Sequence, residues 1–131
     1  MADAFVDVEV LLIAWLSAAR PDTTWAAELD NDLLAYLPFG QVVRVGGDDD
    51  GARLDRALVD VDIYATGRAQ AADIAAWTRT ALTRNLPGSS LPGAVVGRVS
   101  TVSAPAWRPY ENTTLRRMGA TYEVFLHPAV T

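Results

Sequence analysis

The chain of 131 residues contains no cysteine and a single histidine, His127. Without cysteine it can form neither a disulfide nor a thiolate metal site. One histidine excludes a multi-histidine metal site and removes most catalysis that depends on histidine. His127 precedes Pro128 near the C-terminus, which favours a surface or strand-end position. The sequence therefore predicts no metal and no cofactor.

Long apolar runs and a basic excess are also missing. The apolar run 10–16 is far shorter than the roughly 20 residues that span a bilayer. Asp3, Asp7 and Glu9 stand where a signal peptide has its basic region. The net charge of -5 argues against sequence-independent binding of nucleic acid, because phosphates are repelled. We therefore expect a protein made in a cytoplasm that contacts neither a membrane nor a specific nucleic acid.

The composition is that of an ordinary globular protein. Half of the residues are hydrophobic and 21% are charged. A chain of this length buries a real core without disulfide or metal support. We predict one domain that covers residues 1–131.

Residues 54–82 form the stretch around which the chain is organised. From residue 59 to 66 apolar and polar side chains alternate, which indicates a half-buried strand. After Gly67 the apolar spacing changes to that of one helical face. The residues of that face are Ala71, Ile74, Ala75, Thr78, Ala81 and Leu82. We therefore predict a strand and a helix that fold against each other at Gly67.

The rest of the chain supplies a second helix and further strands. Helical spacing over 5–20 ends at Pro21. The predicted strands are a weak one at 23–28 and better ones at 41–46, 94–103 and 116–127, with a helical turn at 30–37 and polar loops at 46–53, 86–93 and 104–115. Short polar loops between consecutive strands favour antiparallel pairing. The predicted fold is α+β and two-layered: a mostly antiparallel sheet of four to five strands with two main helices packed on one face.

Two acidic groups invite a chemical interpretation. The adjacent aspartates 48–50 lack the alternating ligands and closing glutamate of a calcium loop, so a solvated turn is the simpler interpretation. Asp60 and Asp62 project from one face of a strand about 6–7 Å apart, a spacing that an acid and base pair could use. No histidine or nucleophile accompanies them in the pattern, and the serines lie in no nucleophile elbow. We therefore expect a polar strand face and no enzymatic activity.

Trp107, Arg108, Tyr110, Arg116 and Arg117 form the single basic and aromatic cluster of the sequence. Such residues can stack on a nucleic acid strand. They are also the residue types that anchor protein interfaces. Because the chain is acidic overall, we favour a protein partner.

The order of elements and several short motifs resemble the tail terminator (tail completion) proteins of long-tailed bacteriophages. The resemblance covers nearly the whole chain and depends on the combination of its motifs. They are Val45-Gly46-Gly47, Leu54-Asp55-Arg56, the strand 59–64, Arg68 at the start of the helix, residues 99–109, Arg116-Arg117, Ala120-Thr121-Tyr122 and His127-Pro128.

The resemblance implies a virion structural protein at the head–tail junction. It would form a homohexameric ring that caps the head-proximal end of the tail tube, ends tube polymerisation and contacts the head-completion or connector protein. Its expected partners are further copies of itself, the major tail tube protein and that connector protein. Opposite charges are expected to meet across the heterologous ring contact. The predicted subunit or tail interface consists of Asp60, Asp62, Arg68, Trp107, Arg108, Tyr110, Arg116 and Arg117.

Three other hypotheses remain open at this point. Within the same virion, the chain could be a head-completion (stopper) protein or a tube subunit. A small-molecule-binding α+β module would line an apolar pocket with Trp25, Trp107 and Tyr110. A hydrolase would bring Asp60 and Asp62 together in a concave site.

Overall fold

The alternating residues of the central stretch form β3 (Asp55–Ala65), which lies inside a six-stranded sheet. The computed structural model describes residues 5–128. The strand order is β1-β2-β3-β6-β5-β4. β1 pairs with β2 in parallel, and every other neighbouring pair is antiparallel. The other strands are β1 (Thr24–Ala26), β2 (Phe39–Asp49), β4 (Ser90–Leu91), β5 (Ala94–Trp107) and β6 (Arg116–Pro128).

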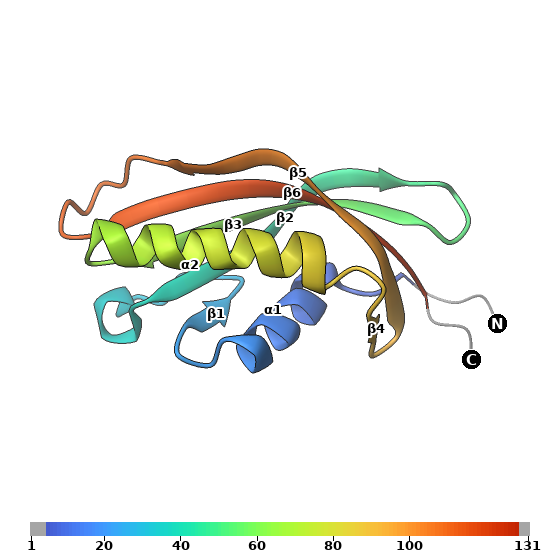
Figure 1. Ribbon diagram of the computed structural model, residues 1–131, viewed down its shortest axis with the longest axis horizontal. Helices are drawn as coiled ribbons and strands as arrows, with labels where there is room; N and C mark the ends of the chain where they lie inside the picture. The colour runs from blue at the N-terminus through green and yellow to red at the C-terminus, as the bar shows by residue number, and fades with distance from the viewer. Residues whose placement is uncertain (1–4, 129–131) are drawn as a thin grey trace.

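Both helices lie against the same face of this sheet (Figure 1). α1 (Val8–Ala19) begins at Asp7, whose carboxylate accepts hydrogen bonds from the backbone N–H groups of Glu9 and Val10. This side-chain cap satisfies donors that have no partner inside the helix. α2 (Arg68–Thr80) follows Gly67 and continues into a short π-helical turn, η2 (Ala81–Asn85). A short 3₁₀ helix, η1 (Leu33–Tyr36), precedes β2. No helix within residues 5–128 is both long and apolar enough to cross a bilayer.

The main core lies between the two helices and the sheet. β3 contributes Val59, Val61 and Ile63, all nearly inaccessible to solvent. β6 contributes alternate residues along its length, and the helices contribute their apolar faces. These partners are Ala120, Tyr122, Val124 and Leu126 of β6, Val8, Leu11, Leu12 and Leu16 of α1, and Ile74 and Ala75 of α2. Burial of this continuous apolar surface is the main contribution to the stability of the fold.

The opposite face of the sheet is covered at one end by a smaller core. Phe39 of β2 and Tyr64 of β3 point to this side and pack with Leu33 and Leu115 from the flanking segments. The packing of this smaller core explains why Tyr64 is almost completely inaccessible to solvent, whereas Asp60 and Asp62, on the same face of β3, are only partly buried. The covered end adjoins the loop between β5 and β6, where the candidate site lies.

The predicted α+β class and the two main helices on one face are confirmed, and the strand count and boundaries are corrected. The sheet has six strands instead of four to five, and one of its pairs is parallel. β2 continues through the predicted turn to Asp49, because a bulge between Arg44 and Gly46 lets both glycines pair with β3. Gly46 and Gly47 have φ angles of 148° and 106°, which favour glycine. A two-residue strand, β4, lies in the loop predicted at 86–93.

β5 departs furthest from its sequence pattern. It continues to Trp107, through a stretch predicted to be irregular. Its register shifts between Val96 and Arg98 and twice more before Trp107. The first bulge places Val96 and Val99 both in the core, although strict alternation assigns them to opposite faces.

Candidate functional site

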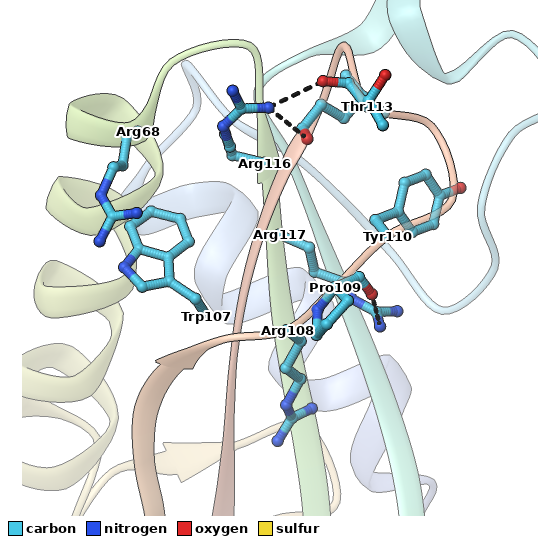
Figure 2. A pocket seen from close by; sticks show the side chains of 9 residues that line it. Arg68, Trp107, Arg108, Pro109, Tyr110, Thr113, Arg116 and Arg117 are labelled. Carbon is cyan, nitrogen blue, oxygen red and sulfur yellow. Dashed lines mark hydrogen bonds between the residues drawn. The ribbon is translucent and has the colours of Figure 1, made fainter.

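The eight residues predicted for an interface gather around the end of the sheet where β5 connects to β6. Six of them line one open pocket of about 460 Å³, together with Pro109, Thr113 and Leu115 (Figure 2). Those six are Arg68, Trp107, Arg108, Tyr110, Arg116 and Arg117. The remaining two, Asp60 and Asp62, lie beside the pocket and bind Arg108. Sequence reasoning therefore selected residues that the fold brings together from three separate segments.

Arg108 lies between the two aspartates of β3. Its Nη1 atom is 2.8 Å from Asp62 Oδ1 and 3.6 Å from Asp60 Oδ2. Asp60 also accepts a short hydrogen bond from the hydroxyl of Thr121. Sequence analysis placed these opposite charges across a subunit contact, whereas the structure pairs Arg108 with both carboxylates inside one chain.

The register between β3 and β6 creates the space for this ion pair. Asp62 stands opposite Gly119, and Asp60 stands opposite Thr121. A Cβ atom at Gly119 would overlap the Asp62 carboxylate and the Arg108 guanidinium. The glycine therefore leaves a slot through which Arg108 crosses β6 to reach β3. Sequence analysis assigned neither Gly119 nor Thr121 to the site, because only the strand register places them beside Asp62 and Asp60.

Burial raises the pKa of the Asp62 carboxyl above its ordinary value, although the positive charge of Arg108 opposes this shift. This upward shift of the pKa shows that removal of the Asp62 carboxylate from water outweighs its attraction to the Arg108 guanidinium. The Asp60–Arg108–Asp62 group therefore orients Arg108, while the burial of Asp62 offsets part of what the ion pair contributes to stability.

The wall of the pocket opposite Arg68 consists of a tyrosine and arginine stack. The Tyr110 ring meets the Tyr64 ring edge-on, with 5.3 Å between centroids. The Arg117 guanidinium lies 5.4 Å from the Tyr110 ring, and its Nη2 donates to the Pro109 carbonyl at 2.8 Å. These contacts attach the β5–β6 loop to the smaller core.

Two further arginines complete the pocket. Arg68, in the first turn of α2, places its guanidinium 4.3 Å from the centre of the Trp107 ring. Arg116 donates from Nη1 to the carbonyls of Thr113 and Leu115 at 2.9 and 3.2 Å. Figure 2 shows Arg68 and Arg116 on one side of the pocket and Arg117 and Tyr110 on the other. Aromatic rings and carbonyl oxygens orient these guanidinium groups but carry no full negative charge to neutralise them.

The geometry bears on the two alternatives from other functional classes. Trp25 does not join the pocket, because it is buried in the main core with its ring 6.4 Å from that of Trp77. The hypothesis of a small-molecule-binding module is therefore wrong in placing Trp25 at the same pocket as Trp107 and Tyr110. Asp60 and Asp62 converge on Arg108 on a sheet face and not on an empty cleft. This arrangement gives an acid and base pair no room for a substrate between the carboxylates.

A second hollow lies on the other side of the molecule, between α1 and the segment that contains β4. It has a volume of about 440 Å³ and a mostly apolar lining. Val10, exposed over 62% of its surface, is the large apolar residue of its lining that is most accessible to solvent. Sequence analysis did not single out this groove, because its two walls are far apart in the sequence.

No protein-family model matches the chain, and no curated protein matches it in sequence. Among solved structures, it is similar to a chain of the structure described as the virion of native gene transfer agent (GTA) particle. The TM-score is 0.66 at 15% sequence identity, and the match covers 92% of this chain and 94% of that chain. At this identity the likeness establishes a shared fold over nearly the whole of both chains.

Proposed function

We propose that this protein is a tail terminator: a virion structural protein that caps the head-proximal end of a phage-like tail tube as a ring. The virion part of this proposal rests on one observation, the nearly full-length likeness of fold to a chain of a gene transfer agent virion. The terminator part, with its ring and its place on the tail tube, rests on the sequence motifs that resemble tail terminators. The role is structural and not enzymatic, and the ring is homohexameric.

The shape of the site supports an assembly role. A ring subunit needs two different surfaces for its two neighbours, since ring contacts are heterologous. Here the β5–β6 loop, which supplies most of the arginine and aromatic pocket, lies at one end of the molecule, and the turn between β2 and β3 lies at the other (Figure 1). Arginine, tryptophan and tyrosine are the residue types that contribute most to protein interfaces.

Electron microscopy of the purified protein tests this function, first alone at high concentration and then mixed with purified tail tubes. We expect rings in the first sample or caps at a single tube end in the second. Particles that remain small and unattached in both samples would contradict the proposal.

The same experiment separates the other virion roles. A tube subunit would lengthen tubes or copolymerise along them instead of capping one end. A head-completion protein would leave tubes unchanged and bind to the connector of purified heads. Both results would keep the virion location and replace the terminator function.

A small-molecule-binding module is the second candidate, and the apolar groove beside α1 favours it. A groove of about 440 Å³ has the size of a small-ligand site. An environment-sensitive apolar dye tests this idea. The module predicts saturable dye binding that Ala14→Arg, at the groove wall, abolishes without lowering the melting temperature. Dye binding that the substitution leaves intact would place the site elsewhere or exclude it.

A further inference from the structure

Three arginines of the pocket lack a direct carboxylate partner within the described residues, and Asp62 attracts one of them, Arg117, only at longer range. Arg68, Arg116 and Arg117 form no ion pair with a carboxylate within residues 5–128, in contrast to Arg108. Their contacts are with aromatic rings and backbone carbonyls. The pocket is therefore a local excess of positive charge in a protein whose net charge is -5.

The chemistry of the pocket selects carboxylates. All 11 basic residues of the chain are arginines. A guanidinium presents several N–H donors in a planar arrangement that matches a carboxylate in two-point contact. The volume of about 460 Å³ admits a few acidic side chains and not a whole folded element. Duplex DNA is disfavoured as the ligand because the rest of the protein is acidic.

The turn between β2 and β3 presents suitable carboxylates. Asp48 pairs with Arg56, whereas Asp49 and Asp50 have no cationic partner within the described part of the chain. All three aspartates are exposed. Asp50 Oδ1 accepts hydrogen bonds at 2.9 Å from the backbone N–H groups of residues 52, 53 and 54, and Asp49 Oδ1 accepts one from Gly51 at 2.7 Å. The turn is therefore an exposed acidic tip that its own side-chain to backbone hydrogen bonds hold together.

The β2–β3 turn and the β5–β6 loop, which supplies most of the pocket lining, lie at opposite ends of the long axis of the molecule (Figure 1). A chain cannot reach its own pocket with its own tip, but a neighbouring copy in the same orientation can. We propose that the acidic tip, residues 48–50, of one copy docks in the arginine pocket of the next copy. This head-to-tail contact is heterologous, and it closes into a ring when the rotation between neighbours divides a full turn. The inference rests on the ring assembly of the proposed function and names its subunit contact.

A charge swap tests the contact directly. Asp49→Arg on the tip and Arg116→Asp in the pocket each place like charges together. Each single variant should weaken self-association at least about tenfold, as measured by sedimentation, while circular dichroism stays native. The chain that carries both changes restores opposite charges and should regain self-association. Failure of the double variant to recover, with native folding, would overturn the proposed contact.

A disulfide trap tests the same contact without relying on high affinity. Because the chain has no cysteine, Asp49→Cys with Arg116→Cys introduces the only two thiols. Mild oxidation should give a ladder of covalent oligomers. The matched control combines Asp49→Cys with Ser17→Cys, on the exposed side of α1, and should give no ladder above background. Equal cross-linking in both proteins would contradict the contact.

The outcomes separate this inference from the proposed function. Rings or tube caps that form while the trap and the charge swap both fail would keep the function and reject the tip–pocket contact. A successful trap without caps on tubes would keep the contact and reject the terminator role. Loss of DNA binding by the Arg116→Asp variant, with unchanged self-association, would assign the pocket to phosphate and overturn the inference.

Discussion

Arg108 depends on its surroundings for its orientation. Two carboxylates on β3 hold its guanidinium, and a glycine on β6 leaves space for its side chain. The side chains of Asp60 and Arg108 retain 29% and 28% of their exposure, and that of Asp62 retains 15%. Water therefore screens the group only in part, and changes to its members should have unequal effects.

Arg108→Gln should destabilise the protein by about 1–2 kcal/mol, because Asp60 and Asp62 then face each other without a cation. Asp62→Asn should stay within about 1 kcal/mol of the parent at pH 7, because burial already disfavours the ionised Asp62. Urea unfolding of both variants measures the difference. Equal decreases in the unfolding free energy of the two variants would contradict the prediction that Arg108 matters more to stability than Asp62.

The raised pKa of Asp62 also sets a pH dependence. A carboxyl with a raised pKa in the folded state contributes stability that is fully present below its unfolded-state pKa and is lost as pH rises through its folded-state pKa. Asp62→Asn removes this contribution. Between pH 4 and pH 7 the unfolding free energy of the variant relative to the parent should therefore rise. A difference that stays constant over this range would count against the shift.

Gly119→Ala should separate Arg108 from Asp62, because the added methyl group occupies the space of both side chains. We expect a loss of about 1–3 kcal/mol of stability. Gly97→Ala is the matched control, since its Cβ would lie 3.7 Å from the nearest atom, the Phe125 carbonyl oxygen. Similar melting temperatures for the two variants would show that the slot at Gly119 is not required.

At the scale of elements, the sequence predicted the helices and strands whose own apolar pattern determines their conformation. The alternation of β3 and β6 and the helical spacing of α1 and α2 appear in the structure as predicted. The bulges in β2 and β5 were not predicted, because an extra residue in a strand can be recognised only against its partner strand. For the same reason the sequence predicted the residues of the site but not that Arg108 pairs with Asp62. This ion pair depends on the strand register and joins residues that are 46 positions apart in the sequence.

The β2–β3 turn is an element that one carboxylate organises. Three backbone N–H groups donate to Asp50, and these bonds lower its pKa. A carboxyl with a lowered folded-state pKa contributes stability above its unfolded-state pKa of about 3.8, and this contribution is lost as pH falls through the folded-state pKa. The turn should therefore loosen in acid before the core does.

Asp50→Ala should raise amide hydrogen exchange at residues 52–54 by more than about tenfold without changing global stability much. Asp49→Ala, which removes a single hydrogen bond to Gly51, should affect only that residue. Nuclear magnetic resonance resolves the two patterns. Unchanged exchange in the Asp50 variant would contradict its role in the turn.

At the scale of the whole molecule, one core joins both helices to the sheet. Val61 lies within it and is exposed over only 2% of its surface. Val61→Asp buries an unpaired charge, at a cost of about 4 kcal/mol or more, which is a large fraction of the stability of a typical domain. We expect circular dichroism to show an unfolded chain. Val102→Asp, at a position 57% exposed, should remain folded, and a folded Val61 variant would contradict the assigned core.

The slot at Gly119 has a consequence for the evolution of this protein. An arginine at position 108, aspartates at 60 and 62, and glycine at 119 fit one another through shared space and charge. A larger residue at 119 is compatible only with a shorter side chain at 108, and that change removes the cation from both carboxylates. Homologous sequences should therefore vary at these four positions together, even where the surrounding strands have diverged freely.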